Sequence, residues 1–188
     1  MRGRMKSWCR RTLRRFCRSE RGVTAVEFAL VLGPFVFLLG CICETGFMLF
    51  TEYVLQNATQ EASRVVRTGQ ASGANGAPPI TAGDFKAIIC NDVGFLIDCD
   101  GKVTVYVDNA PDFASLETTM DDPVDIGPDA GGSAYPVVFN PGPRLVAATV
   151  IATYDWGFVF PFMDWIGNIN GGDARRLYGM AIFRNEPF

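Results

Sequence analysis

An uncharged and strongly apolar stretch near the N-terminus limits most strongly what the chain can fold into. Residues Phe28 to Cys43 carry no charged side chain, and a start at Val23 extends the stretch to 21 residues interrupted only by Glu27. As an α-helix, a segment of this length spans about 31 Å, which matches the hydrocarbon thickness of a bilayer. We therefore predict a membrane-spanning helix. The alternative is the buried core helix of a soluble protein.

The charge distribution orients this predicted span. Residues 1–22 hold nine basic side chains and one acidic one, for a net charge of +8, whereas the remaining residues have a net charge of −11. Basic arms also occur in nucleic-acid-binding proteins, but arginine beside an apolar span is explained by the positive-inside rule. We predict a cytoplasmic leader at 1–22, no nucleic-acid partner, and a chain beyond about residue 50 on the opposite side of the membrane. The apolar run is longer than that of a secretory signal peptide and lacks a nearby A-x-A site, which favours a retained anchor.

The periodicity changes after the span. Apolar residues recur every three or four positions at Phe47, Phe50, Val54, Ala58, Ala62 and Val65, which predicts one face of an amphipathic helix. Gly69 is suited to a C-cap, and Arg64 and Arg67 suit the last turn. The pattern predicts one helix from about 24 to 68. Its apolar face is expected to be covered by the chain's own domain; the alternative is a partner helix in a fibre.

The remaining residues predict a small domain of mixed structure. The expected elements are an uncharged linker at 70–83, a helix at 85–90 capped by Asp84, strands at 102–108, 145–156 and 177–184, an acidic loop at 109–143, and a loop at 157–173 with one helical turn at 162–166. Because no crossover helices separate the strands, we expect an antiparallel sheet against the stalk helix, in the α+β class. The chain thus divides into a leader (1–22), a membrane and stalk helix (23–69), the linker and an exported domain (84–188).

Cysteine and histidine usage limits the chemistry. Cys90 and Cys99 lie close together in the exported part, where an oxidising compartment favours a disulfide; two free thiols are the alternative. The chain has no histidine and no CxxC pair, so zinc and histidine-based catalysis are not expected. We predict no metal and no cofactor.

Two other groups of residues leave alternatives open. The aspartates at 92, 98, 100, 108, 121, 122 and 125 could bind Ca²⁺, but their spacing is not that of an EF-hand, and a solvated acidic surface is the simpler interpretation. Trp156, Phe158, Phe160, Phe162 and Trp165 could form an exposed patch for a partner or could pack in the core.

The start of the span carries a resemblance to a known family. The segment Arg21-Gly22-Val23-Thr24-Ala25-Val26-Glu27-Phe28 resembles a type IV prepilin processing site, most closely that of the Tad (tight adherence, Flp) branch. Glu44 near the end of the apolar run, the helix end at 61–69 and the tail at 184–188 are also similar to TadE-like pseudopilins. Pro34, Cys41 and Cys43 depart from the usual pattern of the span.

The resemblance implies a structural role rather than an enzymatic one. A prepilin peptidase would cut between Gly22 and Val23, and Glu27, Phe28 and Glu44 would serve assembly and charge pairing. The implied partners are the membrane, the peptidase, other pilins or pseudopilins and the inner-membrane pilus platform. The implied location is the inner membrane with a periplasmic domain, or the extracellular pilus. The alternatives are an uncleaved bitopic scaffold of the same machine, a membrane-tethered periplasmic hydrolase and a periplasmic sensor module.

Overall fold

The chain folds as one long helix followed by a small α+β domain, which confirms the predicted fold class. The computed structural model describes residues 20–74, 76, 78–99, 102–128, 135–169 and 172–188, so the predicted leader lies largely outside the described residues. The elements are α2 (Glu20–Arg67), α3 (Ala82–Val93), β1 (Val103–Ala110), α4 (Phe113–Thr119), β2 (Ala147–Gly157), the 3₁₀ turn η1 (Asp164–Ile166) and β3 (Ala174–Arg184). Two compact units divide at Cys43 and Glu44.

The first unit is described only as helix. α2 begins at Glu20 and continues past Pro34 without ending there. Tolerance of an internal proline is common in membrane helices, where neighbouring groups satisfy the backbone that proline leaves unpaired. The apolar part of α2 is long and hydrophobic enough to cross a membrane, and none of its most apolar window is buried in the protein.

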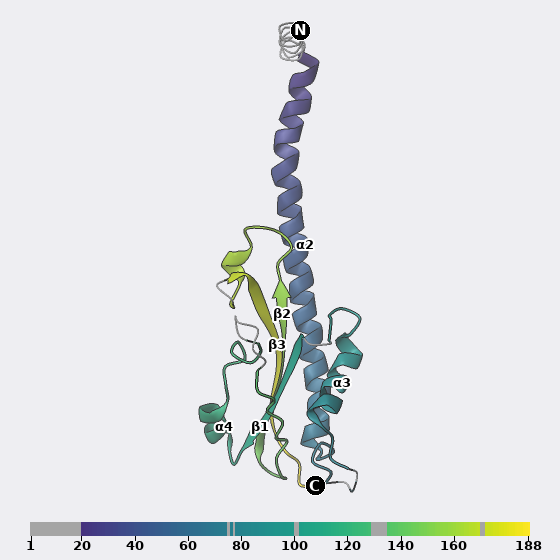
Figure 1. The fold of residues 1–188 in the computed structure, drawn as a ribbon, viewed down its shortest axis with the longest axis vertical. Coiled ribbons are helices and arrows are strands. Elements are labelled where there is room, and N and C mark those ends of the chain that lie inside the picture. The colour runs from purple at the N-terminus through teal and green to yellow at the C-terminus, as the bar shows by residue number, and fades with distance from the viewer. Residues whose placement is uncertain (1–19, 75, 77, 100–101, 129–134, 170–171) are drawn as a thin grey trace, which may run out of the picture. The chain divides into compact units, whose positions relative to one another are not determined.

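The second unit contains an antiparallel sheet in the order β1-β2-β3 (Figure 1). In the middle strand, Val150 pairs with Val107 of β1 and Ala181 of β3. β2 is buried along its first seven residues, on both faces of the sheet. A strand covered on both faces reads as an unbroken apolar run rather than an alternating one, which is why 145–156 has that sequence.

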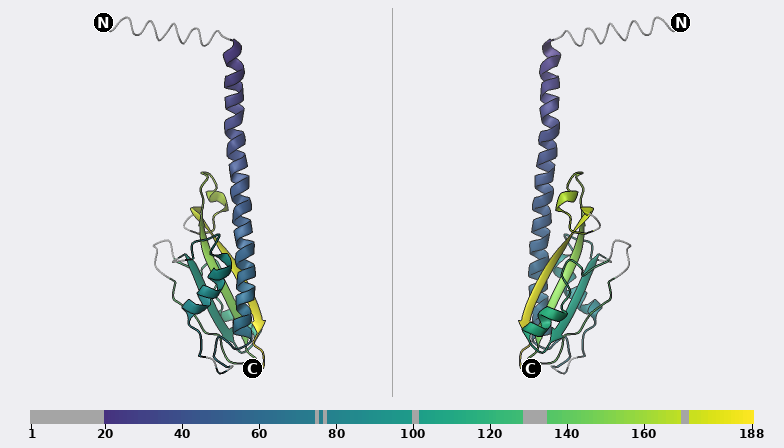
Figure 2. Two further views of the ribbon diagram at one scale, coloured as in Figure 1. Left: turned by 90° about the vertical axis from the view of Figure 1, so that its right-hand side faces the viewer. Right: turned by 90° about the vertical axis from the view of Figure 1, so that its left-hand side faces the viewer.

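One face of the sheet packs on the C-terminal half of α2 and on α3 (Figures 1 and 2). The fully buried residues of this core come from every element around it: Leu55, Val66, Phe85, Ile89, Val107, Val150 and Leu177. The chain's own domain therefore covers the stalk helix, as the sequence predicted. The Cys90–Cys99 disulfide, with a Cα–Cα distance of 5.9 Å, ties α3 to the segment that leads into β1 and confirms the predicted bond.

The buried stripe of α2 differs from the predicted one. Phe47 and Phe50 are about half exposed, whereas Met48, Leu55 and Val66 are buried. Ala58 and Ala62 of the predicted stripe are buried, but the polar residues Thr51, Thr59 and Ser63, which the apolar pattern passed over, are buried as well. The buried stripe is therefore rotated by about one residue. The hydroxyls of the three polar residues donate to carbonyls within the helix, so burying them leaves no donor unpaired.

The other face of the sheet is covered by the connection between β1 and β2. Tyr106 of β1 and Ile151 of β2 are buried beneath Ile126. The prediction of a loop throughout this connection is wrong, because it begins with the short helix α4, whose N-cap Asp112 accepts a hydrogen bond from the Ser115 N–H at 2.7 Å.

The predicted cap of α3 also needs correction. Its N-cap is Thr81, and Asp84 is the third helical residue, which completes a reciprocal capping box. The Thr81 hydroxyl accepts from the Asp84 N–H at 3.2 Å, and the Asp84 carboxylate accepts from the Thr81 N–H at 2.9 Å. The helix therefore starts earlier than predicted and runs to Val93. The predicted turn at 162–166 is confirmed by η1.

Candidate functional site

The predicted processing region lies within continuous helix. The bond between Gly22 and Val23 is inside α2, which begins at Glu20. Val23 and Phe28 are 52% and 64% exposed, and Glu27 is also exposed. The ion pairs of the described residues do not include Glu27. An unpaired carboxylate within a membrane helix is costly, which makes Glu27 a candidate for pairing.

The surface around this region is apolar on every side of the helix. The large apolar side chains from Val23 to Leu39 are at least 36% exposed, with Leu30 and Val31 at 70%. A contiguous apolar surface of this extent is unfavourable in water and requires lipid or other helices around it. The first unit therefore presents an apolar surface suited to a bilayer.

Glu44 does not lie on the surface, where a residue that pairs with a charge of another molecule would be expected. Its side chain is buried, with the residue 7% exposed, and its two carboxylate oxygens accept hydrogen bonds from the N–H groups of Val159 at 2.6 Å and Phe160 at 3.0 Å. Hydrogen bonds to a charged acceptor are stronger than neutral ones, and here they tie α2 to the loop after β2. Its predicted role in assembly remains a prediction; the structure assigns Glu44 this contact within its own domain.

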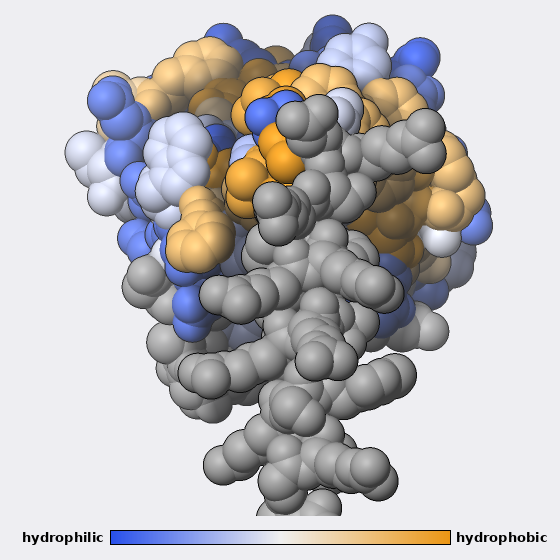
Figure 3. All heavy atoms as spheres, turned by 90° about the horizontal axis from the view of Figure 1, so that it is seen from above, coloured by the Kyte–Doolittle hydropathy of each residue, from blue (hydrophilic) through white to orange (hydrophobic). Residues whose placement is uncertain are grey.

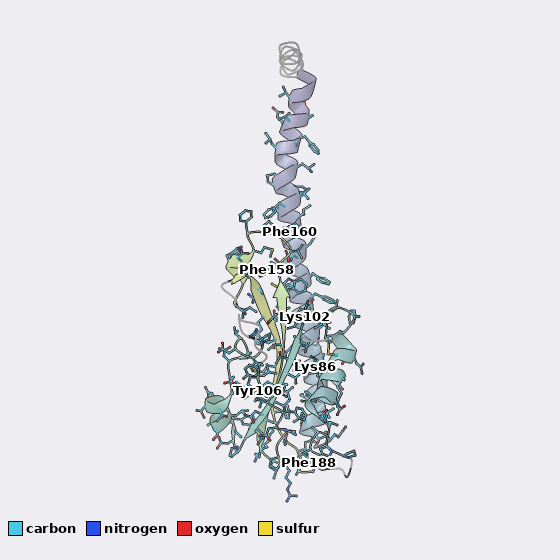
Figure 4. All side chains as sticks on the ribbon, in the orientation of Figure 1. Lys86, Lys102, Tyr106, Phe158, Phe160 and Phe188 are labelled. Carbon is cyan, nitrogen blue, oxygen red and sulfur yellow. A yellow bond between two sulfur atoms is a disulfide. The ribbon has the colours of Figure 1, made fainter. Side chains whose placement is uncertain are left out.

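That loop, residues 157–167, is named the aromatic loop. Figure 4 labels Phe158 and Phe160 beside α2 at this end of the domain. Phe158 packs against the core, and Met163 is buried at 4% exposure. Phe162 and Trp165 are 79% and 83% exposed. The two interpretations of the aromatic cluster therefore apply to different residues, since part of it packs inward and part faces outward.

The backbone of the aromatic loop is tightly constrained. Phe162 has a φ of +69°, a left-handed conformation that a bulky side chain rarely adopts. At the end of the loop, Gly167 passes so close to the backbone of Gly172 that a Cβ there would lie 2.2 Å from the Gly172 oxygen. The guanidinium of Arg175 donates to the Ile166 carbonyl at 3.0 Å. These contacts join the end of the loop to Gly172 and Arg175 at the start of β3.

The opposite end of the domain is closed by the C-terminal tail. The Glu186 N–H donates to the Arg67 carbonyl at 2.9 Å, and the two side chains form an ion pair at 3.1 Å. The ring of Phe188 lies over Gly69, where a Cβ would be 2.6 Å from the ring. Because an α-helix leaves its last carbonyls unpaired, the tail caps α2. This contact gives the tail a physical role that its sequence did not reveal.

Asn185 fixes the tail in place. It is 2% exposed, and its amide donates to the carbonyls of Pro141 at 2.9 Å and Pro143 at 2.8 Å. Its backbone N–H donates to Val146, just before β2. The tail is therefore joined both to the end of α2 and to the start of the central strand.

Arg176 organises a polar network that the sequence analysis missed. Its guanidinium donates to both oxygens of Asp155, at 2.6 and 2.9 Å, and to the carbonyls of Val124 and Pro128, each at 2.7 Å. Its backbone N–H donates to the Asn168 side chain at 2.7 Å. A bidentate arginine–carboxylate pair is strong and geometrically specific. Arg176 lies just before the strand predicted at 177–184. The groups that its guanidinium binds are 21 to 52 positions away, so local sequence gave no signal for this network.

Within the described part of the chain, no three His, Cys, Asp or Glu side chains lie close enough together to hold a metal ion. Of the aspartates considered for Ca²⁺, Asp100 lies outside that part. Two tyrosines cover part of the acidic surface instead. Burial raises the pKa of Tyr106 to about 12, helped by the charges of Asp108 and Asp121. Burial, and the hydrogen bond that the hydroxyl donates to Asp121, also raise the pKa of Tyr135. Both phenols therefore stay protonated at physiological pH and act as donors.

A groove of about 590 Å³ lies beside α2 and α3. Its lining includes the charged residues Glu61, Arg64 and Asp92. Arg64 forms an ion pair with Glu61 at 3.4 Å, so the charges that line the groove are of both signs and do not create a strongly positive or negative site. It shows neither a nucleophile with a base nor a built anion site, and it does not support the hydrolase alternative.

A comparison with protein families found one match, and the matched residues lie within α2. Residues 22–64 match the model of one protein family, TadE-like protein. The match begins at the predicted processing glycine and includes Glu27 and Glu44, and it ends before the sheet and the tail. No curated protein and no solved structure matches the chain.

Proposed function

We propose that this chain, which is TadE-like over residues 22–64, is a membrane-anchored pseudopilin that acts in assembling a Tad-type pilus. The observation that supports it most is the exposed apolar surface of α2, which starts at Gly22 and Val23 and carries a single carboxylate at Glu27. The proposed role is structural. The helix associates with lipid and with other pilin helices, and the domain is carried on the exported side.

Cleavage and assembly are linked by charge in this proposal. A prepilin peptidase cuts after Gly22 and creates a free α-amine on Val23, four positions before Glu27. A carboxylate in a membrane helix is costly unless it is paired, so Glu27 accepts the amine of a neighbouring subunit when helices bundle. The partners are the peptidase, other pilins and the inner-membrane platform of the pilus. The leader faces the cytoplasm and the domain faces the periplasm.

The processing step is tested by the intact mass and N-terminal sequence of the protein from cells with and without the peptidase. The expected result is a peptidase-dependent start at Val23. Gly22→Leu is expected to block cleavage, whereas Gly33→Leu is the matched control, since a side chain at Gly33 meets nothing within 4 Å. A chain that keeps Met1 in cells that form pili would instead support the uncleaved bitopic scaffold.

The charge-pairing step is tested with Glu27→Ala. This variant is expected to be cleaved and to enter the membrane, but to lose pilus assembly, because a helix bundle would contain an unpaired amine. Glu61→Ala is the control, since it removes an exposed carboxylate of the same helix. Pilus counts by electron microscopy provide the readout. Normal assembly by the Glu27→Ala variant would refute the pairing mechanism and leave the cleavage step standing.

A further inference from the structure

We propose that the aromatic loop is a second membrane-contacting element, which inserts Val159, Phe162 and Trp165 at the head-group level of the bilayer that holds α2. This inference rests on the proposed membrane anchor. It adds that the exported domain itself lies on the membrane surface rather than standing clear of it.

The exposure of the loop is the first observation. Val159, Phe162 and Trp165 are 80%, 79% and 83% exposed, while Met163 between them is 4% exposed. The loop thus packs Phe158, Met163 and Ile166 against the domain, while Val159, Phe162 and Trp165 remain exposed. Residues 157–163 carry no charge, and Asp164 is the single charged residue of the loop. Three large apolar side chains are thus highly exposed within seven residues of sequence.

The position of the loop along α2 is the second observation. The uncharged run ends at Cys43, and Glu44 follows it. The Glu44 carboxylate accepts hydrogen bonds from the N–H groups of Val159 and Phe160 in the loop. One turn further along α2, Phe47 contacts Trp156 of β2 with a ring-centroid distance of 5.6 Å. The loop is therefore attached to the helix at the residue where the chain changes from uncharged to charged, which is where a span meets the membrane surface.

The chemistry of the side chains selects lipid as the partner. Tryptophan suits the interface because its ring system is apolar while the indole N–H reaches water or head groups. Phenylalanine and valine are wholly apolar and suit the acyl side of that interface. Figure 3 shows hydrophobic and hydrophilic residues side by side on the part of the surface that the grey atoms leave visible. Asp164 and the loop backbone oppose deeper insertion, since unpaired polar groups are not tolerated in the hydrocarbon.

Quenching of Trp165 by brominated lipids tests the proposal directly. The chain has three tryptophans, so Trp8→Phe with Trp156→Phe leaves Trp165 as the fluorophore in the full-length protein. The protein is reconstituted in phosphatidylcholine–phosphatidylglycerol vesicles with bromine either near the head group or near the end of the acyl chains. The expected result is a loss of Trp165 fluorescence that is larger with the bromine near the head group.

A matched control places the tryptophan at the other end of the sheet. Phe113 is 53% exposed and follows β1, whose last residue Ala110 pairs with Ala147 at the start of β2. The 11 residues of β2 separate this end from the aromatic loop by roughly 33 Å. Phe113→Trp in a chain without the three native tryptophans is expected to show no quenching in the same vesicles.

The outcomes separate this proposal from the membrane anchor. Unquenched Trp165 in protein that resists alkaline extraction overturns the loop proposal and leaves the anchor intact. Extraction by alkali overturns the anchor and with it the loop proposal. A blue shift of Trp165 emission that grows with protein concentration, without quenching by lipid, assigns the surface to a second copy and also overturns the proposal. Glu44→Gln, which replaces one acceptor oxygen by a donor, is expected to reduce the quenching.

Discussion

Gly179 shows how a single residue sets the distance between helix and sheet. It lies on β3, on the face that packs against α2, and a Cβ there would be 2.5 Å from the Thr59 hydroxyl and 2.7 Å from the Leu55 carbonyl. Beside it, the Gln56 amide donates to the Met180 carbonyl at 2.9 Å and accepts from the Met180 N–H at 2.8 Å. A side chain of the helix thus satisfies the backbone of an edge strand, which would otherwise offer unpaired groups to another chain.

Gly179→Ala is therefore expected to destabilise the protein by about 1–3 kcal/mol, because the backbone of α2 must move to admit a methyl group. The free energy of unfolding of the full chain in detergent is measured by chemical denaturation. Gly157→Ala is the control, since a Cβ at the end of β2 meets nothing within 4 Å. Equal stability of the two variants would show that the helix is not packed this closely against β3.

At the scale of elements, carboxylates cap the short helices. Asp112 accepts a hydrogen bond from the Ser115 N–H, and this bond lowers its pKa from the ordinary value of 3.8. The hydrogen bonds that Asp84 accepts from Thr81 lower its pKa too. A group whose pKa is lower in the folded state stabilises the fold above its unfolded pKa, and this contribution is lost as the pH falls through the folded pKa. Both helix starts therefore weaken in acid.

Asp112→Asn is expected to reduce the loss of stability between about pH 5 and pH 2, because asparagine keeps an acceptor oxygen for the cap but does not titrate. Near pH 7 its stability should stay close to that of the parent. Thermal unfolding across this pH range gives the comparison. Asp92→Asn provides the control, since Asp92 lies near the C-terminal end of α3 rather than at its N-terminal cap. An unchanged acid dependence would argue against a charged cap at α4.

At the scale of the whole molecule, the second unit, Glu44–Phe188, is held by contacts at both ends of its part of α2. Glu44 bonds the aromatic loop at one end, and Arg67 bonds the tail through Glu186 at the other. The Arg67–Glu186 side chains are about half exposed, so their ion pair alone contributes at most about 1 kcal/mol. The Cys90–Cys99 disulfide adds a covalent bond between α3 and the segment before β1. α3 packs on the same hydrophobic core as α2.

Removing this disulfide by Cys90→Ser with Cys99→Ser is expected to lower the free energy of unfolding by roughly 2–3 kcal/mol, through the entropy of a short closed loop. Cys43→Ala, which removes an exposed free thiol, is the control. Thiol labelling of the denatured, unreduced protein reports the compartment, because the bond persists only where the domain is exported. Labelling of Cys90 and Cys99 in that sample would place the domain on the reducing side of the membrane.

Much of the fold could be predicted from local sequence, whereas the processing site at Gly22 and Val23 stays a prediction. The uncharged run, the basic residues before it, the end of α2 and the strands of the sheet all follow from hydropathy, periodicity and turn residues within a few positions of one another. The two local errors, the start of α3 and the missed α4, concern caps. Thr81 and Asp112 are polar residues in segments whose sequences are also typical of loops. Both prove to be N-caps, which only the geometry of their cap hydrogen bonds reveals.

What only the tertiary structure decided involves residues far apart in the chain. The sequence by itself determined that a long apolar helix leads into an antiparallel α+β domain. It could not predict that Glu44 accepts a hydrogen bond from an N–H group 115 positions later, or that Gln56 bonds the backbone of a strand 124 positions later. Nor could it predict that the C-terminal tail caps α2. A carboxylate or an amide has the same local pattern whether it faces another subunit, water or its own domain. The choice depends on which distant backbone groups folding leaves unpaired beside it.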